Sequence, residues 1–179
     1  MSQKTVTPKI CYTAAGALIH DNKMLLIKHA KLGLWLAPGG HIEENELPHQ
    51  AAEREVLEET DVAVQVIDPF FHLPAENPQE FYPSPLTSNL HWVSQENYQA
   101  RLKDGEEYQR VEQWQRGCEQ HFNALYLVLP TSGVEYTRDT VETTDIGWFT
   151  KKELQTLDVL PTIRQELSYV FDIYLERVA

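Results

Sequence analysis

Residues 40–62 read GHIEENELPHQAAEREVLEETDV, and they predict a helix whose C-terminal end is crowded with carboxylates. Residues three and four apart share one face of a helix, so Glu55 lies beside both Glu58 and Glu59. Like charges at this spacing destabilise an isolated helix, and acidic groups in its last turn oppose the helix macrodipole. A hard cation such as Mg²⁺, which binds carboxylates, waters and substrate phosphates, would remove the conflict. A solvated acidic face is the alternative interpretation.

The spacing of charged residues across the whole stretch favours the metal site. Counting from Gly40, five residues precede Glu46 and seven more precede Arg54, which begins the run REVLEETDV. This pattern resembles the signature of the Nudix hydrolases and matches eight of its nine fixed positions. The departure is Asp61, where the family has glycine. Glycine suits a left-handed helix C-cap, a conformation that Asp adopts at a cost of about 1 kcal/mol.

The resemblance implies a fold and a reaction. The implied fold is a Nudix-type α/β/α sandwich with a mixed sheet, and the implied reaction is hydrolysis of a pyrophosphate bond in a nucleoside diphosphate linked to another moiety. Mg²⁺, or Mn²⁺, is the implied cofactor, because such reactions depend on positioning and on neutralising phosphate charge. Nucleoside triphosphates, ADP-ribose and other nucleotide sugars stay open as substrates.

The resemblance also implies roles for individual residues. Three glutamates and one main-chain carbonyl are the expected metal ligands: Glu55, Glu58, Glu59 and Gly39. Arg54 is expected to orient the carboxylates, Glu46 in particular, and a bound metal would lower the pKa of the attacking water. A non-catalytic domain that binds a nucleotide metabolite is the alternative, but such domains typically lose these glutamates and this chain keeps them.

The general base is not decided by the signature. Several Nudix enzymes use an acidic residue on a loop before a strand that ends in Trp, and Glu142 stands six residues before Trp148. We expect Glu142 to act as the base or as an additional metal ligand, and the alternative is a solvated loop residue. Glu46 and Glu58 are alternative bases.

Contacts with the substrate are predicted at a strand end and on aromatic rings. Lys28 and His29 are candidates for phosphate contact, although a lysine at a strand end is more often only solvated. Four aromatic side chains are candidates for stacking on a nucleobase: Trp35, Phe81, Tyr82 and Trp92. Aromatic faces accept bases without specific hydrogen bonds, but packing in the core is the commoner fate of such residues.

Composition predicts one soluble domain over residues 1–179. Hydrophobic residues make up 42% and charged residues 23% of the chain, as in a globular protein with a real core. No stretch reaches the roughly 20 apolar residues that cross a bilayer, and the N-terminus lacks the apolar segment of a signal peptide, so we expect a cytoplasmic protein. The net charge of −12 argues against partners such as nucleic acid or an anionic membrane. A homodimer stays possible.

Cysteine and histidine spacing predicts no further site. Cys11 and Cys118 are too few for a disulfide framework and lack a C-x-x-C pattern, so we expect two reduced thiols. Five histidines lack the partner spacing of zinc ligands: His41, His49, His72, His91 and His121.

Periodicity and turn residues predict the remaining elements. Two strands, residues 10–19 and 23–29, are expected to form a hairpin through Asp21 and Asn22. Further strands are expected at residues 62–73, 121–130 and 146–149, a short helix at the capping box of Thr150 and Glu153, and a long helix from Pro161. Six apolar residues of the long helix are expected in the core: Ile163, Leu167, Val170, Phe171, Tyr174 and Leu175.

Residues 74–120 fall outside the family pattern and are expected to form an insertion. Four prolines predict an irregular loop over residues 74–89, and apolar residues spaced three to six apart predict a helical segment over residues 96–120. A surface elaboration, a lid over the substrate and a dimer contact are the open roles of this insertion.

Overall fold

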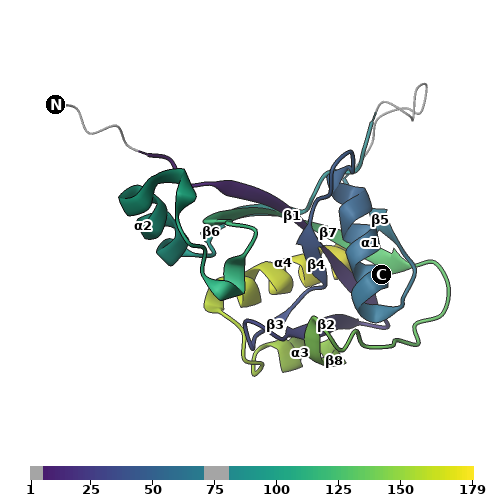
Figure 1. The fold of residues 1–179 in the computed structure, drawn as a ribbon. Coiled ribbons are helices and arrows are strands. Elements are labelled where there is room, and N and C mark those ends of the chain that lie inside the picture. Colours follow the sequence, from purple (N-terminus) through teal and green to yellow (C-terminus); the bar gives the residue numbers. More distant parts are fainter. Residues whose placement is uncertain (1–5, 71–80) are drawn as a thin grey trace.

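The computed structural model describes residues 6–70 and 81–179, which form a mixed sheet with helices on both faces (Figure 1). The strands are β1 (Ile10–His20), β2 (Lys23–His29), β3 (Trp35–Leu36), β4 (Gly39–His41), β5 (Val64–Ile67), β6 (Thr87–Trp92), β7 (Gln120–Pro130) and β8 (Thr143–Thr150). The helices are α1 (Pro48–Thr60), α2 (Gln95–Asp104), α3 (Lys151–Leu154) and α4 (Pro161–Arg177), with 3₁₀ turns η1 (Gly105–Glu107) and η2 (Glu112–Trp114) after α2.

The sheet is organised around β1. Its central order is β3-β2-β1-β7-β5, with β4 paired to β1, β6 to β7 and β8 to β2. The β1 and β7 strands run parallel, with Ala14 opposite Ala124, and the other pairs are antiparallel. The hairpin between β1 and β2 turns through Asp21 and Asn22 at φ 47° and 57°, the left-handed geometry that two-residue hairpin loops prefer.

Successive side chains of β1 point to opposite faces of the sheet, and this alternation produces the two layers of the core. Ala14 and Leu18 pack in a cluster with α1, whereas Ala17 and Ile19 pack in a second cluster with α4. The α1 helix approaches the sheet closely, because a Cβ at Gly16 would lie 2.5 Å from the Val56 side chain. The absence of a side chain at Gly16 therefore lets α1, which carries the glutamates, lie close to β1.

The insertion differs in part from its prediction. An α-helix forms only over α2, and the remainder up to residue 119 contains the two short 3₁₀ turns instead of a longer helix. The strand β6 begins at Thr87, inside the segment expected to be irregular, because it pairs with β7. Figure 1 shows α2 beside the N-terminal end of β1, away from α1. Residues 74–80 of the expected loop lie outside the described residues, as does His72.

Three further expectations need correction or adjustment. Residues 71–73 of the strand expected at 62–73 lie outside the described residues, and within 62–70 the strand covers Val64–Ile67. The strand expected at 146–149 is longer and covers Thr143–Thr150. In α4, Leu175 is 44% exposed and Ile173 is buried, because the apolar face of the helix rotates by part of a turn toward its end. None of the helices in the described ranges is long and apolar enough to cross a membrane.

Cys11 and Cys118 are joined in a disulfide, so the expectation of two reduced thiols is wrong for this structure. The parallel pairing of β1 with β7 brings residue 10 opposite residue 120, which places the two Cα atoms 5.7 Å apart, within the usual range for a disulfide. The cysteines are 107 residues apart in sequence, so local spacing gave no sign of the bond.

Candidate active site

The helix that carries the carboxylates begins and ends at residues suited to those places. Pro48 occupies its first turn, where proline is favoured, and the Leu47 N–H donates to the Gln50 side chain at 3.0 Å. At the other end Asp61 is the C-cap, with φ 63° and ψ 14°, and its N–H donates to the Leu57 carbonyl at 2.8 Å. The left-handed cap expected at this departure from the signature is confirmed.

Arg54 lies at the centre of a carboxylate network. Its Nε and Nη2 donate to the two oxygens of Glu46 at 2.7 and 2.9 Å. Such a bidentate pair of arginine and carboxylate is stronger than one with a single hydrogen bond. Its Nη1 donates to Glu55 at 2.8 Å and to Glu58 at 2.9 Å. The hydrogen bonds that Arg54 donates lower the pKa of Glu46, and the same bonds, those to Glu46 first, raise the pKa of Arg54. The guanidinium thus holds three carboxylates together.

Glu59 is the most deeply buried glutamate of the signature stretch at residues 40–62, the Nudix box, with 2% of the residue exposed. Its Oε2 accepts a hydrogen bond from the Gly39 N–H at 2.8 Å, whereas its Oε1 is buried and has no hydrogen-bond partner among the described residues. Burial raises the pKa of Glu59 to about 8, and the charges of neighbouring carboxylates add to the effect. A cation beside Oε1 would supply the missing partner and lower that pKa, so the residues fit a metal.

Gly40 allows Glu55 to lie against β4. A Cβ at this position would stand 2.3 Å from Glu55 Oε1, so any other residue would displace the carboxylate. Burial raises the pKa of Glu55, and the charges of Glu58 and Glu142 raise it further, while Arg54 lowers it. The glycine of the signature therefore leaves room for the Glu55 carboxylate beside the backbone of β4.

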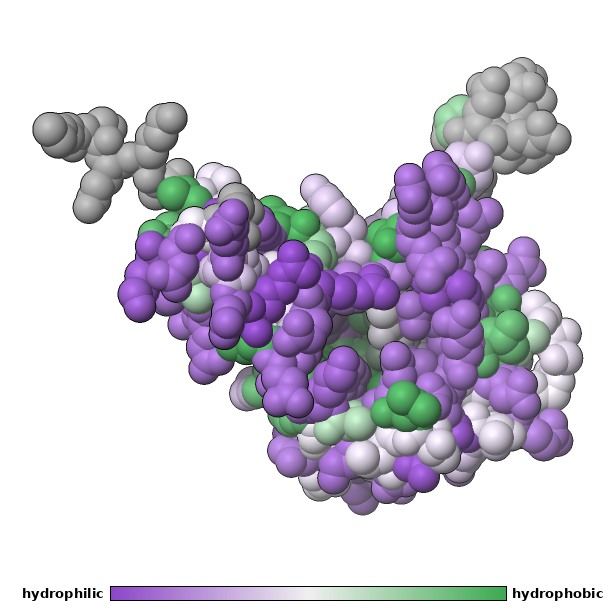
Figure 2. Space-filling model, viewed as in Figure 1, coloured by the Kyte–Doolittle hydropathy of each residue, from purple (hydrophilic) through white to green (hydrophobic). Residues whose placement is uncertain are grey.

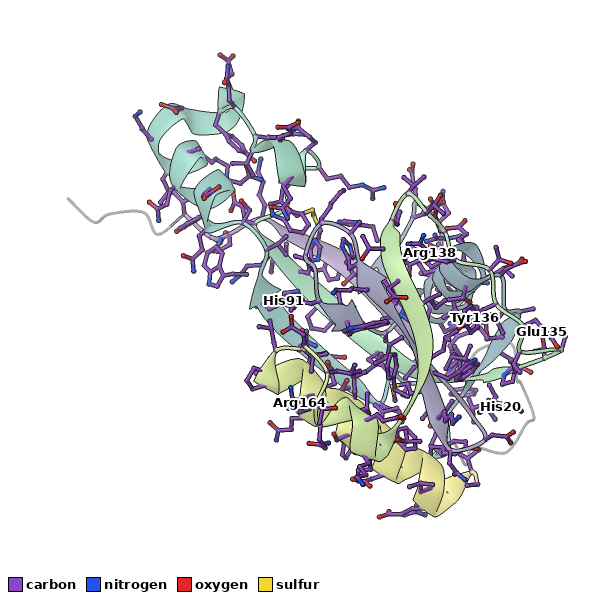
Figure 3. The ribbon with its side chains drawn as sticks, turned by 90° about the horizontal axis from the view of Figure 1, so that it is seen from below. His20, His91, Glu135, Tyr136, Arg138 and Arg164 are labelled. Atoms are coloured by element: carbon purple, nitrogen blue, oxygen red, sulfur yellow. A yellow bond between two sulfur atoms is a disulfide. The ribbon has the colours of Figure 1, made fainter. Side chains whose placement is uncertain are left out.

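The loop between β7 and β8 brings two more acidic residues to the end of α1. The Thr137 and Asp139 N–H groups donate to the carbonyls of Thr60 at 2.9 Å and Glu59 at 3.2 Å. The charges of Glu142 and Asp139 both raise the pKa of Glu59. Figure 3 shows Arg138 and Tyr136 of this loop beside α1, on the far side of the sheet from Arg164 of α4. Glu142 was expected here, whereas Asp139 was missed, because only the path of the loop brings it to the site.

The predicted substrate residues have different surroundings. His29, at the end of β2, lies near Glu142, whose charge raises the pKa of this imidazole against the larger lowering effect of burial. Lys28 is half-buried and lies opposite Asp145 where β2 pairs with β8. Trp35 packs edge-on against Phe149, with ring centroids 4.8 Å apart, beside the core cluster of α4. The charge of Glu142 thus acts on His29, and the contacts of all three residues with a substrate stay predictions.

The other candidate aromatic rings lie at the surface. Tyr82 stacks on His49, with centroids 5.3 Å apart, and Trp92 lies at the same distance from Tyr98 in a tilted arrangement. Phe81 is exposed, as are the Tyr82 and Trp92 side chains in large part. Figure 2 shows mainly hydrophilic side chains over α1 and over the insertion.

Comparison with known proteins decides the family. The family model described as the NUDIX domain matches residues 12–116, which is more than half of the chain. The chain belongs to the Nudix family. Among curated proteins, a "MutT-like protein" of Streptomyces ambofaciens is 37% identical over 65 residues, and the match spans 36% of this chain and 42% of that relative.

Solved structures agree with the Nudix fold. A "hydrolase, NUDIX family" from Clostridium perfringens superposes with a TM-score of 0.66 at 20% identity, covering 90% of this chain and 96% of that one. A "MutT NUDIX hydrolase" from Burkholderia pseudomallei gives 0.59 at 20% identity, covering 96% and 99%. The E. coli dihydroneopterin triphosphate pyrophosphohydrolase gives 0.58 at 12% identity, covering 90% and 94%. The expected α/β Nudix sandwich is confirmed.

The range matched by the NUDIX family model does not include every residue of the candidate site. The match includes the whole box, with its arginine and glutamates, but it ends at residue 116, before β7. Asp139 and Glu142 lie beyond it. The Asp139 N–H donates to the Glu59 carbonyl, and the charge of Glu142 raises the pKa values of Glu55 and Glu59. The Nudix box and this loop together make the candidate active site.

Proposed function

We propose that this chain is a metal-dependent pyrophosphohydrolase that cleaves the diphosphate linkage of a nucleotide. The observation that carries the proposal is Glu59, whose buried Oε1 has no hydrogen-bond partner within residues 6–70 and 81–179, while burial and neighbouring carboxylates raise its pKa. Mg²⁺ is the favoured ion and Mn²⁺ the substitute, because hard cations of this kind prefer carboxylate oxygens. Three glutamates and one main-chain carbonyl would hold it: Glu55, Glu58, Glu59 and Gly39.

Each residue of the site has a distinct task in this proposal. Arg54 keeps Glu46, Glu55 and Glu58 in place against their mutual repulsion, through the hydrogen bonds described above. When bound, the metal would neutralise phosphate oxygens and lower the pKa of a water molecule. Glu142 would accept the proton of the attacking water, since its carboxylate lies close enough to affect both Glu55 and Glu59.

The substrate class is a small nucleotide with a pyrophosphate bond. Nucleoside triphosphates, ADP-ribose and nucleotide sugars belong to this class, and proteins of similar fold include a dihydroneopterin triphosphate pyrophosphohydrolase and a UDP-X diphosphatase. The net charge of −12 supports a small substrate whose charge a metal neutralises, in preference to nucleic acid. A cytoplasmic location, and a monomer or homodimer, complete the proposal.

The test is hydrolysis of a panel of nucleotides by wild type and Glu58→Gln, each with Mg²⁺, with Mn²⁺ and with chelator. The panel contains ADP-ribose, nucleotide sugars, dinucleoside polyphosphates and normal or oxidised nucleoside triphosphates. We expect metal-dependent release of phosphate or nucleotide from at least one compound, reduced at least 100-fold in the variant, because a lost metal ligand removes electrostatic stabilisation of the transition state.

Glu44→Gln is the matched control for this test. Glu44 is an exposed glutamate of the same stretch, outside the carboxylate network, so its amide variant should keep full activity. Nucleotide binding without turnover of any compound would overturn the enzyme and favour a Nudix domain that acts as a nucleotide sensor.

A further inference from the structure

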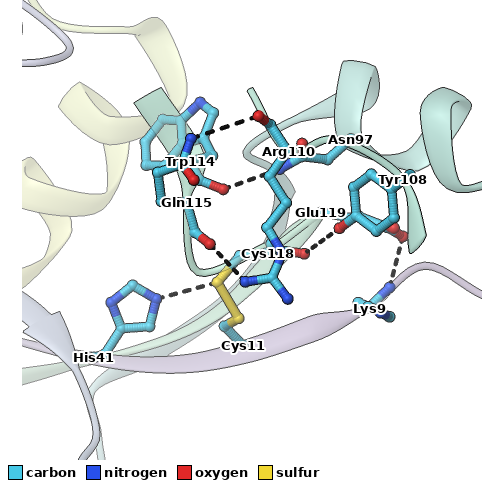
Figure 4. The surroundings of a disulfide bond; sticks show 11 residues. Lys9, Cys11, His41, Asn97, Tyr108, Arg110, Trp114, Gln115, Cys118 and Glu119 are labelled. Carbon is cyan, nitrogen blue, oxygen red and sulfur yellow. Dashed lines mark hydrogen bonds between the residues drawn. A yellow bond between two sulfur atoms is a disulfide. The ribbon is translucent and has the colours of Figure 1, made fainter. Parts of the chain in front are cut away.

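A second cluster of ligand atoms lies outside the Nudix box. It consists of the two sulfurs of Cys11 and Cys118 and the Nε2 of His41, which all lie within 4.8 Å of one another. Figure 4 shows His41 directed at the disulfide, and its Nε2 is 3.3 Å from Cys118 Sγ. The three residues come from β1, from β4 and from the segment before β7, so the tertiary structure alone brings them together.

We propose that Cys11, His41 and Cys118 form a second metal site, which binds a thiophilic divalent cation such as Zn²⁺ once the disulfide is reduced. Thiolate and imidazole ligands favour zinc, whereas carboxylate and carbonyl oxygens favour magnesium. The two sites of this chain would therefore take different ions from the same solution. Two cysteines, one histidine and an open fourth position form a known ligand set for tetrahedral zinc.

The distances suit such an ion with little movement. Tetrahedral zinc at about 2.3 Å from sulfur and about 2.05 Å from nitrogen places its sulfur and nitrogen ligands roughly 3.5 Å apart, and its two sulfurs roughly 3.8 Å apart. The 3.3 Å between His41 Nε2 and Cys118 Sγ is already close to that value. The two sulfurs, bonded to each other in this structure, have to separate, and Cys11 Sγ, which lies within 4.8 Å of His41 Nε2, has to reach roughly 3.5 Å from that nitrogen.

The disulfide and the metal-bound form are linked by a balanced exchange. A dithiol reductant breaks the bond between the two sulfurs, supplies two electrons and two protons, and becomes a disulfide itself. Cys11 and Cys118 are then thiols, and both lose their protons when the cation binds. A reducing compartment favours the thiol form of such a pair, so the two cysteines would be able to bind the cation there.

The cation also has a route to the site and a nearby polar group. A cleft of about 610 Å³ is lined by Cys11 and His41 and extends to Arg116 and the start of α1. The ring of His121 stands edge-on to His41, with centroids 4.9 Å apart, and its Nε2 is buried without a hydrogen-bond partner among the described residues. In this proposal a water that hydrogen-bonds to the His121 imidazole would fill the fourth position.

Co²⁺ is the probe for the first experiment, because thiolate bound to Co²⁺ gives charge-transfer absorption in the near ultraviolet. The full chain is compared in its reduced and its oxidised form, in excess Mg²⁺ so that the carboxylates of the box are occupied. We expect a band that saturates at one Co²⁺ per reduced chain, disappears when Zn²⁺ is added and is absent from the oxidised chain. No band in the reduced chain, with native circular dichroism, would overturn the proposal.

Variants then test the three ligands. Cys118→Ser and His41→Gln should each weaken Co²⁺ binding at least 10-fold, whereas the matched control His91→Gln, which changes a neighbouring imidazole outside the cluster, should bind as wild type does. Glu58→Gln should keep the band, which separates this site from the Nudix box. A band of wild-type strength in Cys118→Ser would refute the assignment, and protection of both thiols from alkylation by Zn²⁺ in the wild-type chain would support it.

Discussion

At the scale of the residue, Asp61 is the one departure from the Nudix signature, and its effect on the free energy of unfolding can be measured. It holds a left-handed conformation, φ 63°, that glycine adopts without strain. We expect Asp61→Gly to raise the free energy of unfolding by about 0.5–1 kcal/mol, because relief of strain exceeds the added freedom of the unfolded chain. Urea denaturation measures the change, and Asp61→Ala, which keeps a Cβ in the same conformation, should not stabilise the protein. A less stable glycine variant would contradict this account.

Glu59 predicts how the stability of the metal-free protein depends on pH. Its pKa rises from 4.5 to about 8 on folding, so between these values the folded state binds more protons than the unfolded state. Stability therefore falls as pH rises from about 4.5 to 8, by at most about 5 kcal/mol, since one pKa unit corresponds to about 1.36 kcal/mol. Denaturation at several pH values with chelator should show the fall, and Mg²⁺ should remove it at pH 8.

The variant Glu59→Gln isolates the contribution of this one carboxyl group. It keeps the size of the side chain but cannot ionise, so its metal-free stability should vary less between pH 4.5 and 8 than that of wild type. Its stabilisation by Mg²⁺ should also be smaller, because one metal ligand is lost. An unchanged pH profile in the variant would show that Glu59 is not the group responsible.

At the scale of the element, α2 is attached to the sheet by a buried ion pair. Arg101 of α2 donates from Nε and Nη2 to Glu119 at 2.5 and 2.7 Å, and the Lys9 N–H donates to the same carboxylate at 2.8 Å. Both side chains are almost fully buried. These hydrogen bonds join the insertion to the beginnings of β1 and β7, next to the disulfide.

Breaking this pair should destabilise the protein more than removing it altogether. We expect Arg101→Leu to lower the free energy of unfolding by about 3–5 kcal/mol, because it leaves the buried Glu119 carboxylate without its cation. The double variant Arg101→Leu, Glu119→Leu should recover most of this loss, since no buried charge remains. Urea denaturation of the four proteins of the cycle gives the coupling energy, and additive effects would contradict the prediction.

At the scale of the whole molecule, the candidate active site includes the loop between β7 and β8, which is hydrogen-bonded to the end of α1. Asp139 and Glu142 meet the Nudix box because their loop follows the end of α1 before entering β8. If Glu142 is the general base, Glu142→Gln should lower kcat about 100-fold or more and remove the acidic limb of the pH–rate profile. Asp139→Asn should reduce activity less and keep the profile, and equal profiles for wild type and Glu142→Gln would assign the base elsewhere.

Local patterns in the sequence determined the helix, its ends and the grouping of its carboxylates. Glu55, Glu58 and Glu59 share a face because the helix repeat depends only on backbone geometry. The start at Pro48 and the left-handed Asp61 follow from preferences that act within a turn. Family membership could be predicted for the same reason, because the signature lies in one continuous stretch.

Only the tertiary structure decided which distant residues meet. The parallel register of β1 with β7 brings Cys11 to Cys118 across 107 residues, and the pairing of β4 with β1 adds His41. The path of the β7–β8 loop likewise selects Asp139 as a neighbour of Glu59. Such registers are set by packing summed over the whole sheet, and no local spacing encodes that sum. The carboxylate site was therefore visible in the sequence, whereas the cysteine and histidine site was not.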